Sequence, residues 1–509
     1  MIGDHLENRV LLEMQAYIAR LSQNLEFLCR AAGESLHSEK LRRTVRAMAV
    51  WGPYPWRSFD HSLKPLNSFG LIKLSLALPF HLFQGLGYLA LKYFQYLPYR
   101  NFRRVDYSKK SLGVFSPSLH LLEFSDRSYT GFWGEVKFLS EEMSLKTAWF
   151  LVPFKATGTS NRQLVHQIKQ INHESQFRLI PLASFLSMQI LAEAIIDLIS
   201  FHAFLAKLIF YEATKKSDIK VCRIFVQEQL GMGIARTELN RHLLGAGIAQ
   251  GTQLKSILHL MEGQSWEIAL NDLSLGLDLP CWGVIHTPLR AQDSQILNYL
   301  LKCNERSLAE LKKNICCPGR SSLETLTGLG VPQSQLQVVE SQRFIHFQVL
   351  KKFTYSSVSR KVLYVSDANI KTTEHFTKLI GDKSGHRNKS NLEFFLQPHP
   401  SQSHIEFSGL PLVNRLEAHD FGVIIFGPET SSYLQPEFNE CNIRFFNPPM
   451  PPQRFLQMKY LGIPQVENLE DIEISLENSF KLNKDDDLLI LRDDSFTKWR
   501  KVIDELFKP

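Results

Sequence analysis

The amino-acid sequence predicts an α/β protein with two Rossmann-like domains that face each other across a cleft, and with an additional helical region at the N-terminus. Its 509 residues are too many for one ordinary hydrophobic core. Short apolar runs alternate with helical segments from about residue 112, and a second series of the same kind begins at residue 361. Such βαβα alternation is typical of parallel sheets with helices on both faces.

The helical N-terminal region is assigned to residues 1–105, because residues 1–50 carry apolar residues at helical spacing. A connector rich in Trp and Pro, WGPYPW, separates this segment from the long apolar stretch 69–97. Charged residues such as Lys73 and Lys92 are costly at bilayer depth. We therefore expect residues 69–97 to form a core helix or a helix that lies at a membrane surface.

The first Rossmann-like domain is assigned to residues 106–350. A second apolar stretch, 187–211, contains Glu193 and Asp197 and is also expected to be a buried or amphipathic helix. Strands are expected at 112–118, 119–125, 146–154, 177–182, 256–261 and 281–287, and helices at 133–143, 160–175 and 266–274. Residues 312–357 are mixed and rich in turn residues.

The second Rossmann-like domain is assigned to residues 355–509, after the polar linker KKFTYSSVSR. Strands are expected at 361–367, 393–400, 421–427, 443–449 and 488–492, with helices at 372–381, 428–438 and 495–507. Ligands of open α/β sheets bind beyond the carboxyl ends of the strands. This rule draws attention to the loops after Val365, Leu396 and Phe426.

Composition excludes several classes of protein. The 58 basic and 51 acidic residues leave a net charge of +7 without a block of like charges, so we expect no nucleic-acid partner. The seven cysteines are scattered and form no CxxC pair, which favours reduced, buried thiols in a cytoplasmic protein. The polar and acidic first residues, MIGDHLENRV, are unlike a signal peptide. We expect a cytoplasmic location, with peripheral attachment to the inner membrane as an open alternative.

Two motifs of the second domain have phosphate-binding chemistry. GPETSS at 427–432 leaves a predicted strand and enters a predicted helix, where free backbone N–H groups and hydroxyls attract phosphate. Ser and Thr are also ordinary capping residues, so this motif alone leaves both interpretations open. In QPHPS at 397–401, two prolines hold one histidine, His399, which can donate a hydrogen bond to a phosphate oxygen. The two motifs follow successive strands of one domain.

A third motif lies in the first domain, where MEGQSWE at 261–267 follows one predicted strand and precedes a helix. Glu262, beside a glycine, could remove a proton from a sugar hydroxyl, although a lone loop carboxylate is more often simply exposed. The next strand ends at GVIHTP, and His286 and Arg290 follow there. These side chains are expected to share one rim of the first sheet, which would face the second domain.

The order of an acidic residue with glycine, then His-Pro, then Ser-Ser resembles the bacterial glycosyltransferase-B sialyltransferases and related transferases that use CMP-activated sugars. In these families the acidic residue is the general base, the histidine contacts the donor phosphate, and the Ser/Thr pair binds that phosphate. The resemblance implies these roles for Glu262 and His399, and for Ser431 with Ser432. The chain departs from the family in one respect: Met261 replaces the first of two acidic residues, which is often the base.

Segments 128–154, 177–187, 260–272 and 283–300 are similar to a group of bacterial surface carbohydrate or O-antigen biosynthesis proteins. Both resemblances imply an inverting, metal-independent glycosyltransferase of surface-polysaccharide assembly. Its partners would be a nucleotide sugar, for which a CMP-linked sugar is one candidate, and a glycan or lipid-linked acceptor. The expected donor contacts are Ser366, Pro400, Gly427, Glu429, Thr430, Ser431 and Ser432, and the expected acceptor contacts are Gln264, Trp266, His286 and Arg290.

Two other functions stay open. A non-catalytic scaffold that binds glycans or organises an assembly complex is favoured by Met261. A sugar-nucleotide epimerase of the same architecture would need no separate acceptor. We expect neither a metal nor another cofactor, because the sequence contains no DxD motif at a strand end and no histidines at metal-ligand spacing.

Overall fold

A computed structural model provides the structure of the chain. It describes residues 68–104, 111–117, 147–153, 160–174, 178–214, 231–250, 254–261, 264–289, 313–328, 331–342, 354–367, 370–381, 391–399, 410–413, 420–428, 441–447, 463–481 and 495–507, together with isolated positions between these ranges.

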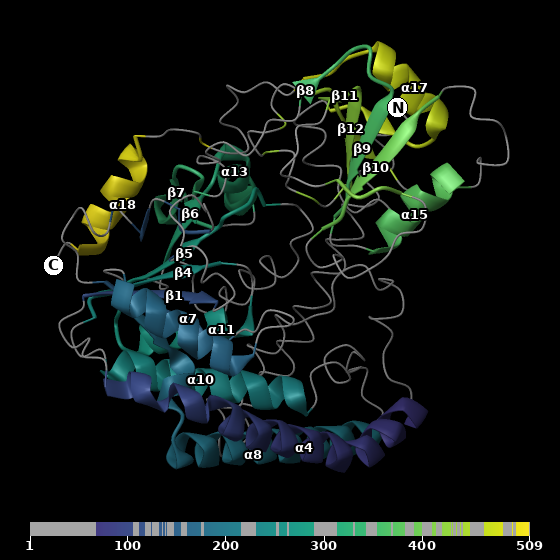
Figure 1. The fold of residues 1–509 in the computed structure, drawn as a ribbon. Helices are drawn as coiled ribbons and strands as arrows, with labels where there is room; N and C mark the ends of the chain where they lie inside the picture. Colours follow the sequence, from purple (N-terminus) through teal and green to yellow (C-terminus); the bar gives the residue numbers. More distant parts are fainter. Residues whose placement is uncertain are drawn as a thin grey trace.

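The first domain is built on a seven-stranded sheet in which every pair of neighbouring strands is parallel (Figure 1). The strand order is β3-β2-β1-β4-β5-β6-β7. The strands are β1 (Leu112–Pro117), β2 (Thr147–Val152), β3 (Leu179–Pro181), β4 (Ser256–Leu260), β5 (Cys281–Val284), β6 (Lys313–Cys317) and β7 (Leu336–Val338).

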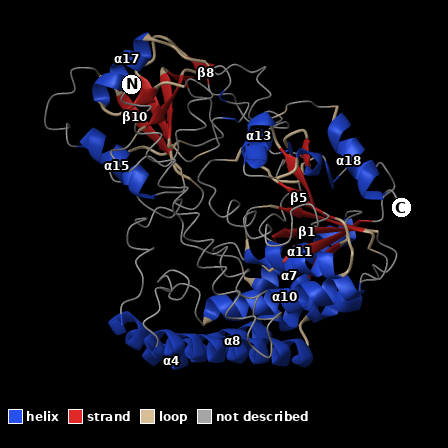
Figure 2. Ribbon diagram, turned by 180° about the vertical axis from the view of Figure 1, so that it is seen from behind, coloured by secondary structure: helices blue, strands red, loops and turns tan. Residues whose placement is uncertain are grey.

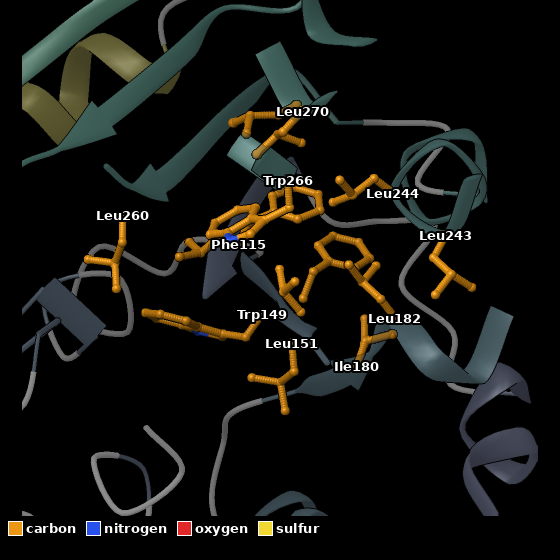
Figure 3. Close-up of a cluster of buried hydrophobic side chains, with 14 of the residues drawn as sticks. Phe115, Trp149, Leu151, Ile180, Leu182, Leu243, Leu244, Leu260, Trp266 and Leu270 are labelled. Carbon is orange, nitrogen blue, oxygen red and sulfur yellow. The ribbon is translucent and has the colours of Figure 1, made fainter. Parts of the chain in front are cut away.

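Apolar side chains on both faces explain why these segments form a central parallel sheet. All residues of β1, β2, β4 and β5 are buried, as expected for strands that are covered by helices on both sides. Phe115 stacks on Phe150 with ring centroids 4.7 Å apart. Figure 3 shows these strands contributing Phe115, Trp149 and Leu260 to one cluster, which helical residues such as Leu244 complete.

Helices cover the sheet in layers (Figure 2). The helix α10 (Met232–Gln250) packs against the sheet side of a pair of long helices, α4 (Ser68–Tyr96) and α8 (Met188–Thr214), which form the outermost layer. The other helices of this domain are α7 (Asn161–Glu174), α11 (Ser265–Gly276) and α13 (Arg320–Gly328), with 3-10 turns η1 (Leu97–Arg104), η3 (Leu182–Phe185) and η4 (Gln333–Gln335).

The second domain has a five-stranded parallel sheet of order β10-β9-β12-β13-β14. Its strands are β9 (Lys361–Val365), β10 (Glu393–Gln397), β12 (Val423–Phe426), β13 (Ile443–Phe446) and β14 (Gln465–Val466). A small parallel pair, β8 (Thr354–Tyr355) with β11 (Asp420–Phe421), adjoins it, and the helices are α15 (Ile370–Gly381) and α17 (Leu469–Glu477). Asn468 caps α17 in a capping box with Asp471.

The C-terminal helix α18 (Thr497–Phe507) packs on the first domain. Its buried face, which includes Trp499 and Ile503, belongs to the same hydrophobic core as the first sheet. The sequence-based division placed this helix at the end of the second domain. It differs from the structure because the amphipathic pattern of a helix predicts which face is buried but not which sheet buries it.

The expected fold class of two Rossmann-like domains is confirmed, as are the long helices at 69–97 and 187–211. Four strands were not foreseen. Residues 312–357, expected to be mixed, contribute β6, β7 and β8, and the fourth strand is β14, which has only two residues. The expected helix at 1–50 and most of the expected strand at 119–125 and of the helices at 133–143 and 428–438 lie outside the described residues.

Candidate functional site

The strand order of the second sheet contains a topological switch point. The strand β9 lies between β10 and β12, so the chain leaves β9 to one side and later returns to the other side. Open α/β sheets bind ligands in the crevice at such a point, beyond the carboxyl ends of the strands. The three loops expected from the sequence follow β9, β10 and β12, and therefore lie at one edge of this sheet.

Backbone and side-chain hydrogen bonds join these three loops. The N–H of Gly427 donates to the carbonyl of Val365 over 2.7 Å, and the N–H of Ser366 donates to the carbonyl of Gln397 over 3.0 Å. The backbone N–H of His399 donates to the Ser366 hydroxyl over 2.7 Å. The structure thus brings three of the predicted site residues, Ser366, His399 and Gly427, into one rim.

Gly427 has a steric role at this rim. A Cβ atom added there would lie 2.7 Å from the backbone nitrogen of Asp367 and 3.1 Å from its Cβ. The loops after β12 and β9 can approach this closely only because residue 427 has no side chain. Thr430 continues the loop as a turn, in which its N–H donates to the Gly427 carbonyl over 3.2 Å.

Asp367 is a rim residue that the sequence analysis did not single out. Its side chain is fully buried at the switch point, directly beside Gly427. Because it is buried, this side chain lies beneath the rim and supports the loops after β9 and β12. The signal in the sequence was the dipeptide Ser-Asp at the end of the strand KVLYV, of which only Ser366 was considered.

The side chain of His399 is half-buried. Pro398 restricts the backbone before it, and the hydrogen bond to Ser366 anchors its N–H. This residue therefore projects from a fixed point of the rim, as the two prolines in the sequence indicated. Six other predicted site residues lie outside the described residues: Glu262, Arg290, Pro400, Glu429, Ser431 and Ser432.

The first sheet has its own switch point, between β1 and β4. The N–H of Met261, which follows β4, donates to the carbonyl of Val284 over 2.8 Å, and the N–H of Ile285 donates to Cys316 over 3.0 Å. The segment that leads to Glu262 therefore starts at the carboxyl edge of this sheet, beside the segment that leads to His286.

Two residues near this edge belong to the hydrophobic core. Met261 is 1% exposed and packs in a cluster with Ile268 and Ile285. A carboxylate in its place would be buried in apolar surroundings, where ionisation is unfavourable. Trp266 was expected to contact the acceptor, but it is also 1% exposed and lies edge-on to His259. Its position in the first turn of α11 directs the indole inward, so it supports the rim from below.

The remaining acceptor candidates lie closer to the surface. His286 is half-buried and meets the ring of Phe132 edge to face, with centroids 4.3 Å apart. Gln264 stands at the N-cap of α11 without a side-chain capping bond, so its amide does not serve the helix end. Both residues flank the segment that contains Glu262.

One group of side chains in the helical layer has potential metal ligands. Ligand atoms of Asp197, Glu238 and His242 lie within 4.8 Å of one another. Arg241 already bridges them, with its guanidinium 2.5 Å from Asp197 and 2.8 Å from Glu238. Burial lowers the pKa of Arg241, but the two carboxylates outweigh this effect and raise it. Arg241 thus supplies the positive charge that balances the two carboxylates. The same ion pairs connect α8 to α10.

Comparisons with known proteins complete the description. No protein-family model matches the chain, and no curated protein sequence does. Among solved structures, the UDP-GlcNAc 2-epimerase of Methanocaldococcus jannaschii in complex with UDP-GlcNAc and UDP is 8% identical, with a TM-score of 0.45, over 78% of this chain and 99% of that one. The Neisseria meningitidis UDP-GlcNAc 2-epimerase bound to UDP-GlcNAc is 9% identical, with a TM-score of 0.38, over 78% and 99%.

A transferase is similar at the same level. CalG4, the calicheamicin glycosyltransferase, is 12% identical, with a TM-score of 0.36, over 73% of this chain and 91% of that one. Because these TM-scores lie below 0.5, we base no assignment on them.

Proposed function

We propose that the protein is a glycosyltransferase that takes a sugar from a nucleotide-activated donor. The observation that carries this proposal is the rim at the switch point of the second sheet, where hydrogen bonds join the three loops that carry Ser366, His399 and Gly427. Gly427 lets two loops approach each other closely beside His399, whose backbone is held by a hydrogen bond. Such a rim suits the diphosphate or monophosphate of a nucleotide sugar.

The roles of the residues follow from their chemistry. His399 donates a proton or a hydrogen bond to the departing phosphate oxygen, and the hydroxyls of Thr430, Ser431 and Ser432 bind the same phosphate. In the first domain, Glu262 removes the proton of the attacking acceptor hydroxyl, and Gln264, His286 and Arg290 orient the acceptor. Inversion at the sugar carbon results from this single displacement.

The finer parts of the proposal rest on the resemblances in the sequence. The donor is a CMP-linked sugar, the acceptor is a glycan or a lipid-linked glycan of surface polysaccharide, and the enzyme works in the cytoplasm, attached peripherally to the inner membrane. It requires no metal. The donor site belongs to the domain at 355–509 and the acceptor site to the domain at 106–350.

A test of the donor site uses calorimetric titration of the full chain with CMP, UDP and GDP. Tight binding of CMP supports the proposal as a whole, and tight binding of UDP supports a transferase with a different donor. Conversion of the nucleotide sugar alone, without an acceptor, would instead identify an epimerase. If none of the three nucleotides binds, the result would favour the non-catalytic scaffold.

The role of His399 predicts a loss of turnover. His399→Ala should lower the rate of sugar transfer by about 10²- to 10⁴-fold, because a positioned acid is lost from the transition state. The measurement is single-turnover transfer with saturating donor. His375→Ala is the matched control, since His375 is an exposed residue of α15 in the same domain. Equal rates for the wild type and His399→Ala would remove His399 from the mechanism.

A further inference from the structure

The helix α8 carries large apolar side chains on its outer side as well as on its inner side. The inner side packs in the core through residues such as Leu198 and Phe201, and Asp197 is buried there 2.7 Å from His242 of α10. On the outer side, Met188, Ile196 and Ile199 are 63%, 57% and 46% exposed. The exposed polar residues among the described side chains of α8 are Gln189 and Lys207. A helix that needed only water on its outer side would carry mostly polar residues there.

The neighbouring helix α4 has an outer face of the same kind. Exposed large apolar side chains recur along it at intervals of three, four and eight residues, which places them on one stripe. They are Leu76 (77% exposed), Phe80 (61%), Phe83 (73%), Leu91 (54%) and Phe94 (67%). Gly87 and Ala90, which are also exposed, fill the stripe between Phe83 and Leu91.

These two stripes form one surface. The helices α4 and α8 lie side by side, and α10 covers the inner side of both (Figures 1 and 2). Together they hold eight of the fourteen exposed large apolar side chains found among the described residues. We call this surface, made by the outward residues of α4 and α8, the apolar face. Exposed apolar side chains gathered on two neighbouring helices are typical of an interaction site.

The charges of α4 and of the 3-10 turn η1 that follows it indicate an anionic partner. Residues 68–104 contain five basic residues, Lys73, Lys92, Arg100, Arg103 and Arg104, and no acidic residue. In α8, the acidic residues Glu193 and Asp197 pair with His242 of α10. At the end of α4, Lys92 lies over the half-buried ring of Tyr88 and the buried ring of Tyr96, and Arg100 lies over the half-buried ring of Tyr93. Amphipathic aromatic rings beside basic groups are typical of the level of lipid headgroups. A second copy that met α4 with its own α4 would bring two basic segments together.

The polar residues within the layer determine how the face meets a membrane. By length and composition, Met188–Lys207 is one described helix that could cross a bilayer. However, the ion pairs of Asp197 with Arg241 and His242 hold it against α10, a helix that is itself covered by the sheet domain. Spanning would separate these charges or carry them into hydrocarbon, at high cost. These ion pairs favour a position in the plane of a membrane surface over one across it.

We propose that the apolar face of α4 and α8 docks in the plane of an anionic phospholipid surface, with its aromatic stripe among the acyl chains and its basic residues at the headgroups. This inference depends on the geometry of the helical layer and not on the proposed transfer reaction. A chain docked in this way would meet a lipid-linked acceptor at the membrane where that acceptor resides.

The test is co-sedimentation of the full chain with vesicles of phosphatidylcholine alone and of phosphatidylcholine mixed with phosphatidylglycerol. We expect stronger binding to the anionic vesicles and weakening with added salt. The double variant Phe80→Ser/Phe83→Ser should lower the vesicle partition coefficient at least about tenfold, because two apolar side chains no longer enter the acyl region. Ile196→Ser/Ile199→Ser should act in the same direction, because α8 shares the face.

The matched controls are Val358→Ser and Ile474→Ser, which remove exposed apolar side chains (87% and 51%) from the second domain. Both should bind vesicles like the wild type. Light scattering after gel filtration is measured in parallel. A wild-type protein that stays in the supernatant with every vesicle overturns the proposal, as does binding that both double variants leave unchanged. A dimer that the double variants convert to monomers, without vesicle binding, would identify a second copy as the occupant. No substrate is involved, so these outcomes are independent of the proposed activity.

Discussion

Gly427 shows how strongly one residue can constrain the rim of the second sheet. A Cβ atom at this position would lie 2.7 Å from the backbone nitrogen of Asp367. A backbone atom cannot move aside as the end of a flexible side chain could. The sequence suggested phosphate binding by the whole loop at 427–432. The structure adds that the glycine itself is required for the crossing of two loops.

A substitution at this glycine tests that requirement. Gly427→Ala should destabilise the fold by about 1–3 kcal/mol through overpacking, and it should weaken nucleotide binding, because the loop after β12 must shift away from Asp367. Thermal unfolding and titration with the preferred nucleotide measure the two effects. The control is Gly276→Ala in α11, where nothing lies within 4 Å of an added Cβ. Unchanged melting and binding in Gly427→Ala would show that the crossing tolerates a methyl group.

At the scale of elements, the helical layer depends on a close approach between α4 and its neighbours. A Cβ on Gly85 would lie 2.8 Å from the Leu198 side chain of α8 and 2.9 Å from the carbonyl of Gly231. Gly87, two residues later on the same helix, has nothing within 4 Å. One glycine of α4 thus permits packing, whereas the other only weakens the helix.

These two glycines predict opposite effects on stability. Gly85→Ala should lower the melting temperature, because the helices must separate or the Gly231 backbone must move. Gly87→Ala should raise stability slightly, by up to about 1 kcal/mol, because alanine favours the helix. Differential scanning calorimetry of both variants measures the difference. A Gly85→Ala protein as stable as Gly87→Ala would mean that α4 and α8 do not pack closely at this point.

His202 of α8 makes the same layer sensitive to pH. Burial lowers the pKa of His202 below the ordinary value of 6.5, and the nearby His81 lowers it further. The hydrogen bond with the Leu198 carbonyl raises the pKa but does not outweigh these two effects. The Nδ1 atom lies 2.8 Å from that carbonyl, and Nε2 has no hydrogen-bond partner among the described residues. The folded state therefore binds fewer protons than the unfolded state just below pH 6.5.

Because the folded pKa is lowered, this histidine contributes stability that is present above about pH 6.5 and lost as the pH falls toward the folded value. His202→Gln should therefore reduce the loss of melting temperature on acidification from neutral pH. Unfolding curves between about pH 5 and 8 provide the measurement. The exposed helical residue His166 supplies the control, His166→Gln, which should keep the wild-type pH dependence. The same acid sensitivity in His202→Gln would contradict the prediction.

At the scale of the whole molecule, the last helix binds the end of the chain to the first domain. The buried carboxylate of Glu340 accepts hydrogen bonds from the N–H groups of Lys498 (2.8 Å) and Trp499 (3.0 Å), in the first turn of α18. The Trp499 indole donates to the Glu340 carbonyl over 2.7 Å. A carboxylate at a helix N-terminus satisfies free N–H groups and favours the helix dipole.

Loss of this carboxylate should loosen the C-terminus. Glu340→Gln replaces charged acceptors with a neutral amide and should cost about 1–3 kcal/mol. We expect limited proteolysis to release the segment around α18 faster than in the wild type, while the second domain stays intact. Glu324→Gln, at an exposed position of α13, is the control. Identical cleavage of the Glu340→Gln and Glu324→Gln proteins would argue against the cap.

The sequence alone determined the features that depend on local periodicity. Buried strands such as β1 and β12 are short apolar runs bounded by turn residues, and α4 is an apolar stretch too long for a strand, so these elements could be predicted. The loops after β9, β10 and β12 could be chosen as the site by the same reasoning, because parallel strands bring their carboxyl ends to one edge.

Only the tertiary structure decided features that depend on distant partners. In the structure, Asp367 lies beside Gly427, and Met261 and Trp266 lie in the hydrophobic core. The helix α18 packs on the first domain. The structure also showed that α8 has large apolar side chains on its outer side, while Asp197 on its inner side pairs with Arg241 of α10. The periodicity of apolar residues shows that a helix has two different faces. The residues that pack on each face come from elsewhere in the chain, so their positions depend on the complete fold.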